Sequence, residues 1–491
     1  MLVIDEGTTG TRALIINKDC HIESYRYSEI TQHYPAPGWV EHDPMEIWNR
    51  TFAMIQSALN EAKLSGKDIA AIGISNQSST SILWDRHTGL PIHNALVWQD
   101  RRGTDFIQTI RKEWEPRVLP RAGATLRPSS SAILLWWLMA NVPGARERAA
   151  VGDLLFGTVD SWLIYNLTGK KVHVTSASNA SQCRAYDMTA DCWNEEWLTF
   201  LGIPMQIFSP VQDDAGFLGY TDPALFGAEI PIASASRDQS AALFGQGCHQ
   251  PGNVKCTHGT GTFLDMNIGN TLSVSPHGVS TWIVWRRGGV NTYAMEGYAA
   301  VTGSAVQWLR DGAQLIQHAS ETEALAESVE DNGGVYFVPA LAGLSAPHWD
   351  PFACGMIIGI TRGTRRAHLV RATLEGIVLA TRDFIETMSQ DSGIPIHLLR
   401  VDGGASVNNF LLQFQADLLD CRVERTNNPE AACLGAAFLA GLEVGFWQSE
   451  SDCLARIQID RVFDPRMQQE ERERICAEWK KAVDRCKSWL K

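Results

Sequence analysis

The chain has 491 residues, which is too long for one hydrophobic core, so we expect two domains of similar size. Its 45% hydrophobic and 20% charged residues are ordinary for a globular protein. The net charge of -13 excludes a general nucleic-acid binder, because no basic face is apparent that would neutralise a phosphate backbone.

The N-terminus lacks the basic region and the apolar core of a signal peptide. The longest apolar run, residues 132–140, is far short of the roughly 18 residues that a membrane span needs. The eleven cysteines are odd in number and include no CxxC pair, which indicates reduced thiols. We therefore expect a cytoplasmic protein with no membrane partner.

The first predicted element is a short strand at residues 1–4 that leads into Asp5 and a turn rich in glycine and threonine. Backbone N–H groups and hydroxyls in such a turn can surround phosphate oxygens, and Arg12 adds a positive fork. A tight hairpin in which Asp5 only bonds the turn amides is the alternative. Residues 13–16 then form the returning strand.

A helix is predicted over residues 43–62, where an Asp-Pro pair starts a run of apolar residues at helical spacing. A buried strand at residues 69–75 follows, and Gln77, Ser78 and Ser79 come directly after its carboxyl end. Open α/β sheets place their ligands at that end of the strands. The next predicted elements are strands at residues 82–85, 95–98 and 152–158 and a helix at residues 159–166.

A strand at residues 230–234 leads to Asp238 and a short helix at residues 240–245. Beyond it the chain begins again, because residues 258–263 repeat the glycine and threonine turn of the N-terminus. The elements that follow are a helix at residues 366–390, strands at 396–401 and 422–425, and helices at 409–419, at 431–444 and beyond residue 465. This alternation predicts an α/β fold with two related halves.

Several long blocks of the chain resemble the FGGY carbohydrate kinases, and among these the glycerol kinases. The blocks occur in the family's order, so the match is far more specific than a lone glycine turn. They are residues 5–12, 37–44, 94–102, 155–160, 238–239, 259–261, 307–310, 346–351 and 401–409. The resemblance implies two ribonuclease H-like (actin-like ATPase) domains, with polyol binding at residues 1–245, ATP binding at residues 246–491 and an interdomain cleft.

The resemblance also implies ATP and Mg²⁺ as cofactors. Asp5 would position the Mg²⁺, and Thr8, Thr9 and Arg12 would hold the transferring phosphate, which suits a reaction catalysed mainly by positioning and charge neutralisation. An ordinary strand-to-helix turn at Gly404 and an exposed helix position for Gln307 are the alternatives to nucleotide binding. The implied nucleotide contacts are Gly259, Thr260, Gly261, Gly303, Gln307, Gly404 and Asn408.

Asp238 is implied to be the base that accepts the proton of the acceptor hydroxyl. A helix N-terminus favours the ionised carboxylate, so we expect Asp238 to be a weak base. Phosphoryl transfer tolerates a weak base, because the proton leaves late. The alternative is an N-cap for the helix that starts at Ser240, and the two roles are compatible.

The acceptor side departs from the glycerol kinases. Ser78 and Ser79 replace an Arg-Glu pair of those enzymes, and Ser129 replaces the tyrosine that closes their pocket. If the backbone is unchanged, the pocket is wider and has lost its charged fork. The expected acceptor contacts are Gln77, Ser78, Ser79, Trp98, Ser129, Asp238, Gln239 and Phe263.

We therefore predict a kinase for a small polyol or ketose longer than glycerol, such as a tetritol or a pentulose. A true glycerol kinase that grips glycerol differently is the first alternative, and a sugar-sensing protein with little turnover is the second. Arg127 and Arg237 either replace the lost charge, contact an acidic group of the substrate, or pair with surface carboxylates. We expect no nucleic-acid partner and a homodimer or homotetramer.

Overall fold

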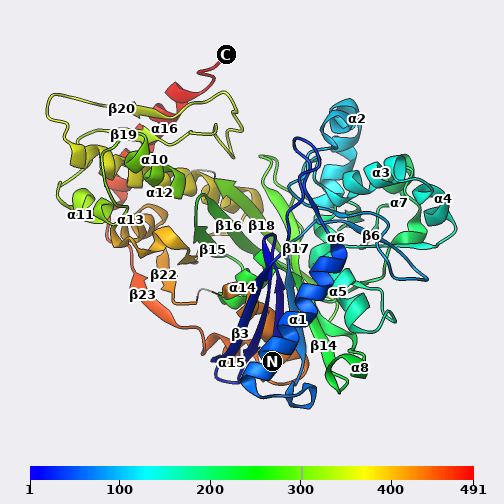
Figure 1. Ribbon diagram of the computed structural model, residues 1–491. Helices are drawn as coiled ribbons and strands as arrows, with labels where there is room; N and C mark the ends of the chain where they lie inside the picture. Colours follow the sequence, from blue (N-terminus) through cyan, green and yellow to red (C-terminus); the bar gives the residue numbers. More distant parts are fainter. Residues whose placement is uncertain (300–301, 429) are drawn as a thin grey trace.

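The computed structural model describes residues 1–299, 302–428 and 430–491. One sheet of thirteen strands runs through both halves of the molecule (Figure 1), in the order β23-β22-β21-β15-β16-β18-β17-β13-β14-β5-β1-β2-β3. The first half of the chain lies on one side of the centre of this sheet and the second half on the other. The predicted α/β architecture is confirmed.

The first half supplies six strands of the large sheet: β1 (Leu2–Glu6), β2 (Gly10–Ile16), β3 (Ile22–Glu29), β5 (Ile72–Asn76), β13 (Ala215–Tyr220) and β14 (Pro231–Arg237). Its helices are α1 (Pro44–Ala62), α2 (Thr104–Ala122), α3 (Ser131–Asn141), α4 (Ala145–Ala150), α5 (Val159–Leu167), α6 (Ala177–Gln182), α7 (Glu195–Phe200), α8 (Pro223–Phe226) and α9 (Asp238–Gly245). Short strands outside that sheet are β4 (Glu41–His42), β6 (Ile82–Asp85), β7 (Ala95–Leu96), β8 (Leu154–Gly157), β9 (Thr175–Ser176), β10 (Tyr186–Asp187), β11 (Cys192–Trp193) and β12 (Val211–Gln212).

The second half supplies β15 (Asn253–His258), β16 (Thr262–Gly269), β17 (Ser280–Arg287), β18 (Val290–Ala299), β21 (Leu398–Asp402), β22 (Arg422–Thr426) and β23 (Ile459–Phe463). A separate hairpin pairs β19 (Tyr336–Val338) with β20 (Met356–Ile358). The helices are α10 (Gly303–Asp311), α11 (Glu321–Glu327), α12 (Arg366–Ser392), α13 (Asn409–Leu419), α14 (Ala431–Glu443), α15 (Glu450–Leu454) and α16 (Gln469–Cys486).

The two halves repeat one strand arrangement. In the first half, β1 pairs antiparallel with β2, β2 with β3, and β5 and β14 follow in parallel on the other side of β1. In the second half, β15, β16 and β18 form the antiparallel part, and β21 and β22 follow in parallel. Each half therefore opens with an equivalent hairpin, as the repeated turn in the sequence predicts.

Helices α9 and α14 hold the halves together by close backbone packing. A Cβ atom on Gly435 would lie 1.7 Å from the carbonyl oxygen of Ala241, and one on Gly245 would lie 2.0 Å from that of Ala431. Only glycine permits such an approach. The small-residue runs in these two helices are thus explained by their contact.

Most predicted elements are present with shifted ends, but several elements were not predicted, among them the strands β3, β13, β17 and β18 and the helices α2 and α3. Helix α1 begins as expected, since the Asp43 carboxylate accepts a hydrogen bond from the N–H of Met45 at 2.8 Å. Helix α2 was not predicted because Pro116 and Pro120 lie inside it and normally end a helix. Tertiary packing of its apolar face outweighs that signal, through the buried residues Ile107, Ile110, Trp114, Val118 and Ala122.

Among residues 1–299, 302–428 and 430–491, no helix combines the length and the apolar character needed to cross a bilayer. All eleven cysteines are free thiols. Most of them are buried, and burial raises the pKa of Cys183 and Cys248 to about 12. The prediction that most of the thiols are packed agrees with this burial, and their reduced state stays a prediction.

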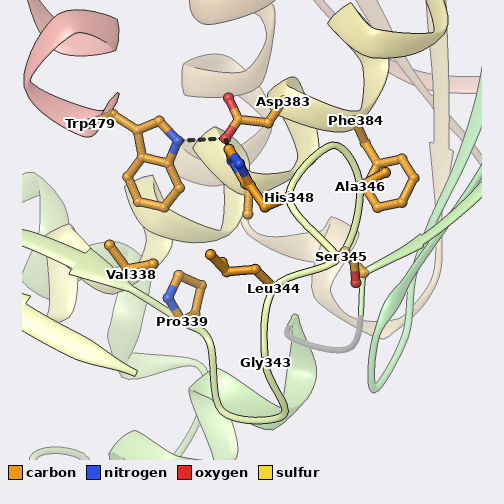
Figure 2. Close-up of a pocket in the computed structure, with 12 residues that line it drawn as sticks. Val338, Pro339, Gly343, Leu344, Ser345, Ala346, His348, Asp383, Phe384 and Trp479 are labelled. Carbon is orange, nitrogen blue, oxygen red and sulfur yellow. Dashed lines mark hydrogen bonds and ion pairs between the residues drawn. The ribbon is translucent and has the colours of Figure 1, made fainter. Parts of the chain in front are cut away.

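Figure 2 shows a small pocket between the loop of residues 343–348, helix α12 and helix α16. Its polar groups bond each other, because Trp479 Nε1 donates to the Asp383 carboxylate at 2.8 Å and His348 lies 3.9 Å from the same carboxylate. A cavity of about 30 Å³ holds about one water molecule. This pocket contains none of the predicted site residues.

Glu6, at the end of β1, is a buried carboxyl with one unpartnered oxygen. The hydroxyls of Thr11 and Thr51 both donate to its Oε2, the latter at 3.2 Å, whereas Oε1 has no hydrogen-bond partner among the described residues. Burial raises the pKa of Glu6 to about 8, although the two hydroxyls act in the opposite direction. Glu6 is therefore mainly protonated at neutral pH.

We expect the Glu6→Gln variant to gain stability relative to the wild type as the pH rises. The folded chain keeps the Glu6 proton up to about pH 8, whereas the unfolded chain releases it near pH 4.5, so the wild type loses stability between these values. Over this range the wild type loses up to about 1.4 kcal/mol of unfolding free energy per pH unit. The Tm of E6Q should rise relative to wild type between pH 5 and pH 8, while that of E29Q, at an exposed position of β3, stays parallel to it. Parallel curves for E6Q would contradict a protonated Glu6.

Candidate active site

Three neighbouring parallel strands, β1, β5 and β14, end at one edge of the sheet. Asp5 pairs in register with Ser75, and Ser75 with Ser236, so the three strand ends are level. Asp5 is therefore brought close to Asp238, which follows β14 directly, although more than two hundred residues separate them in the chain. This is the edge where open α/β sheets bind ligands.

Asp5 and Arg12 face each other across the first hairpin. Arg12 Nη1 donates to Asp5 Oδ2 at 2.5 Å, and the turn between them is closed by the N–H of Gly7 bonding the carbonyl oxygen of Gly10 at 3.0 Å. Partial burial lowers the pKa of Arg12, but the Asp5 charge outweighs it and the pKa is raised. Asp5 thus bonds Arg12 rather than the turn amides, which corrects the alternative reading of this hairpin.

Two residues predicted to contact the acceptor also form hydrogen bonds with this turn. Gln77 Nε2 donates to the Gly7 carbonyl oxygen at 3.2 Å, and its Oε1 accepts from the Thr80 hydroxyl at 2.9 Å. Gln77 is buried and both of its side-chain polar atoms are thus bonded within the protein, and its contact with the acceptor stays a prediction. Trp98 Nε1 donates to the Thr8 hydroxyl at 2.8 Å, but the ring remains 41% exposed and available for contact.

The second hairpin turn lies against the start of α10. The N–H of Gly259 bonds the carbonyl oxygen of Gly261 at 2.9 Å, and the N–H of Gly303 bonds that of Gly259 at 3.0 Å. A Cβ atom on Gly303 would lie 2.7 Å from the Gly259 carbonyl oxygen, so the helix reaches the turn only because this residue is glycine. The N–H of Ser304 likewise bonds the carbonyl oxygen of Thr260 at 3.1 Å, so the first N–H groups of α10 hold the turn in place.

A cavity of about 710 Å³ opens beside this turn. That volume suits a nucleotide-sized ligand. Six of the seven predicted nucleotide contacts line it, which brings together parts of the chain about 150 residues apart. They are Gly259, Thr260, Gly303, Gln307, Gly404 and Asn408.

The structure refines two of these positions. Asn408 caps helix α13, because its side-chain oxygen accepts from the N–H of Leu411 at 2.9 Å. A Cβ atom on Gly404 would meet nothing within 4 Å, whereas one on Gly403 would lie 2.5 Å from the carbonyl oxygen of His258. The glycine that this turn requires is therefore Gly403, which sequence reasoning placed in the turn without assigning it a role.

Asp238 is the first residue of α9 and lies near enough to Asp5 for the Asp5 charge to act on it. Its Oδ1 accepts from the N–H of Gln239 at 2.7 Å, so the predicted role as N-cap of a helix starting at Ser240 is wrong. Burial raises the pKa of Asp238 to about 6, with Arg237 opposing and Asp5 adding to the rise. Burial thus outweighs the helix N-terminus, and Asp238 is a stronger base than the sequence predicts.

Arg237 is buried in an ion network that spans both halves of the chain. Its Nη1 donates to Glu296 Oε2 at 2.6 Å, and Asp265 Oδ1 lies 3.8 Å from Nη2. Lys255 Nζ completes the network through Asp265 Oδ2 at 3.0 Å. Arg237 is 1% exposed, so it pairs with carboxylates as one alternative proposed, but in the interior rather than on the surface.

Lys255 was missed by sequence reasoning, because nothing in the mixed polar strand Asn253–His258 marks this lysine as buried. Besides Asp265, it donates to Gln239 Oε1 at 2.7 Å. This bond holds the side chain of Gln239, a predicted acceptor contact, beside Asp238. Burial lowers the pKa of Lys255, but the attraction of nearby carboxylates, mainly Asp265, is larger. The pKa is therefore raised overall and the ammonium stays charged.

The three serines on the acceptor side do not behave alike. Ser79 is 4% exposed and its hydroxyl donates to the carbonyl oxygen of Gln182 at 3.3 Å. Ser78 and Ser129 are partly exposed. Phe263 is 39% exposed and packs on Tyr298 with ring centroids 4.5 Å apart. Two free hydroxyls, rather than three, are therefore available on this side.

Arg184 lies between the replaced positions and was missed by sequence reasoning. Its Nε donates to the carbonyl oxygen of Thr125 at 2.8 Å, and its Nη1 to that of Gln182 at 3.5 Å, the same oxygen that Ser79 contacts. A guanidinium therefore remains near this side of the site. The charge missing at Ser78 and Ser79 is thus partly offset by an arginine that the sequence did not single out.

Comparison with known proteins matches both halves of the chain to domains of the same protein family. The family model for the FGGY family of carbohydrate kinases, N-terminal domain, matches residues 1–245, and the model for the C-terminal domain of that family matches residues 254–444. Glycerol kinase 2 of Thermotoga maritima is 49% identical over all of this chain and 99% of that protein. Glycerol kinase of Petrotoga mobilis is 47% identical over all of this chain and 99% of that protein.

Solved structures agree with these sequences. The crystal structure of Plasmodium falciparum glycerol kinase with ADP superposes with a TM-score of 0.93, at 33% identity over 99% of this chain and 98% of that one. A ligand-bound xylulose kinase from Lactobacillus acidophilus reaches 0.86 at 19% identity, over 98% of this chain and 97% of that one. The second likeness bears on the fold alone.

We expect Lys255→Met to destabilise the protein strongly. Removal of one partner leaves the Asp265 carboxylate buried without its nearest cation, which costs about 3–5 kcal/mol of unfolding free energy. The control is Lys481→Met, because Lys481 belongs to an exposed pair with Glu478 and should cost less than about 1 kcal/mol. Thermal unfolding of both variants measures the difference, and equal Tm values would show that the network is not stabilising.

Proposed function

This chain belongs to the FGGY family of carbohydrate kinases, and from that premise we propose that it transfers the γ-phosphate of ATP to a terminal hydroxyl of glycerol or a polyol of similar size. The observation that carries the proposal is the convergence of Asp5, Arg12 and Asp238 at level strand ends. The second turn at residues 259–261 borders the cavity proposed for the nucleotide.

The coarser predictions from the sequence are confirmed by family membership. The chain has the two-domain actin-like ATPase fold, and it is an ATP-dependent phosphotransferase. The alternative of a sugar sensor with little turnover therefore loses its support. The relatives named glycerol kinase favour the first alternative, a glycerol kinase with an altered grip, over the predicted larger acceptor.

Asp238 is proposed as the base for the acceptor hydroxyl. A carboxylate with a pKa of about 6 is ionised at neutral pH and is yet basic enough to take a proton late in the transfer. The hydrogen bond between Gln239 and Lys255 supports the start of helix α9 beside it. The hydroxyl oxygen would then attack the γ-phosphorus while its proton passes to Asp238.

The first turn is proposed to hold the transferring phosphate through Arg12, Thr8 and Thr9. Asp5 fits a Mg²⁺ ion, because its Oδ1 has no hydrogen-bond partner among the described residues and hard cations bind carboxylate oxygens together with substrate phosphates. When bound, that ion would neutralise charge on the phosphates. Arg12 adds a second positive charge from the protein itself.

Four further predictions from the sequence remain proposals. They are the roles of the individual site residues, the domain boundary between residues 245 and 246, a cytoplasmic location and assembly as a homodimer or homotetramer. A larger neutral acceptor, a tetritol or a pentulose, is the second candidate substrate. The replacement of a pocket tyrosine by the partly exposed Ser129 favours it.

A coupled assay of ADP release tests the acceptor. Among neutral compounds we expect turnover of glycerol, and we compare its kcat/KM with those of erythritol, threitol, ribulose and xylulose. A clearly higher kcat/KM for a longer compound would replace glycerol by the second candidate. Binding of ATP without turnover of any acceptor would overturn the proposed function.

Asp238→Asn tests the base. We expect kcat to fall at least about 100-fold, because an amide cannot accept the proton, while ATP affinity in an equilibrium titration stays within about twofold. In the wild type, kcat/KM should fall about tenfold per unit below pH 6, because protonation of Asp238 removes the base. The control is D19N, in an exposed turn. A D238N variant with most of its activity would leave Asp238 a structural role only.

A further inference from the structure

Arg184 is a buried cation without a carboxylate partner. It is 5% exposed, and its two hydrogen bonds go to backbone carbonyl oxygens of Thr125 and Gln182. Its guanidinium lies 4.9 Å from the centre of the Trp282 ring, and no carboxylate oxygen of the described residues lies within 4.0 Å. Buried charges are normally paired, because unpaired burial costs several kcal/mol.

The nearest carboxylate on this side is already occupied. Glu296 accepts from Arg237 at Oε2 and from Trp282 Nε1 at Oε1, the latter at 3.3 Å. Both of its oxygens are therefore bonded by other residues. Arg184 must share the field of Glu296 with Arg237, and burial lowers the pKa of Arg184 to about 9.

A second arginine adds another positive charge without a carboxylate partner. Arg127 is exposed, and its side chain makes no ion pair or hydrogen bond with the described residues. It lies near enough to Arg184 for its charge to lower the pKa of Arg184 further. Glu296 acts on both arginines, but its two oxygens are bonded by Arg237 and Trp282, so the pair lacks a carboxylate of its own.

The position of the pair points to the acceptor. Arg127 begins the turn of residues 127–130, which contains Ser129 and is closed by the Ser130 hydroxyl donating to the Arg127 carbonyl oxygen at 2.8 Å. Arg184 is tied to Thr125 just before that turn and, through the Gln182 carbonyl oxygen, to Ser79. The cations thus border the two places where the acceptor side differs from the glycerol kinases.

We infer that Arg127 and Arg184 bind the carboxylate of a small polyol acid, whose far hydroxyl reaches Asp238. Guanidinium groups match carboxylate oxygens in geometry and charge. This inference rests on the proposed function and changes the preferred acceptor of the same site from a neutral polyol to its acid. The hydroxyl oxygen bonds the γ-phosphorus, the bond to the bridging oxygen breaks, ADP leaves with the electron pair, and the proton passes to Asp238. The acceptor carboxylate is unchanged in the product.

Matched acceptors of equal length test this inference. We compare kcat/KM for glycerate against glycerol and for erythronate against erythritol, in the coupled assay with the full chain. A charge-assisted contact predicts an advantage of at least about tenfold for each acid. If the neutral compounds are equally good or better, the inference is overturned while the proposed function stands. If no acceptor is phosphorylated although ATP binds, both are overturned.

Variants separate binding of the acid from a general defect. Arg127→Gln, at an exposed position, should raise KM for the acids about tenfold and leave kcat/KM for glycerol within about twofold. Arg184→Lys keeps the charge and should retain part of the preference for acids that Arg184→Gln loses. R117Q, an exposed position on α2, should change neither. Equal losses for acids and glycerol in R127Q would overturn the inference.

A binding measurement is independent of catalysis and of the folding of the Arg184 variants. Erythronate without ATP should raise the Tm of the wild-type chain, because a ligand that binds only the folded state stabilises it. Erythritol at the same concentration should raise it less, and R127Q should lose the difference. Identical shifts with erythronate and erythritol in the wild type would contradict a carboxylate site.

Discussion

The buried ion network of Arg237, Glu296, Asp265 and Lys255 is the interaction on which the site depends. Its members come from β14 in the first half and from β15, β16 and β18 in the second, so it fixes one half against the other. It also sets the surroundings of Asp238, because Arg237 precedes this residue and Lys255 holds its neighbour Gln239. Buried charges tolerate little displacement of their partners, which makes the network a rigid support.

The repeated strand order explains why each half carries a glycine turn, and we propose that the two turns serve one site. Both hairpins belong to the same thirteen-stranded sheet. The close contact of α9 and α14 through Gly245 and Gly435 keeps the two halves of the chain close together. We propose that residues far apart in the chain border one reaction site in this way.

Much of the frame was predictable, because its signals are local. The capped helix at residues 43–62, the turn after β1 and the alternation of strands and helices all follow from neighbouring residues. Helix α2 was missed because its prolines outweigh a packing face that only the fold reveals. The hydrogen bonds of Gln77 and the raised pKa of Asp238 were missed for a similar reason, because partners from distant parts of the chain and burial decide them.

The sequence by itself determined the class of fold, the pair of phosphate-facing turns and the candidate residues at the strand ends, since short-range patterns encode periodicity and turns. Only the tertiary structure decided which charges are neutralised. Arg237 proved to be a paired interior cation, whereas Arg127 and Arg184 have no carboxylate within reach among the described residues. Ion pairing depends on distance and burial between residues that the chain separates widely, so no local pattern records it.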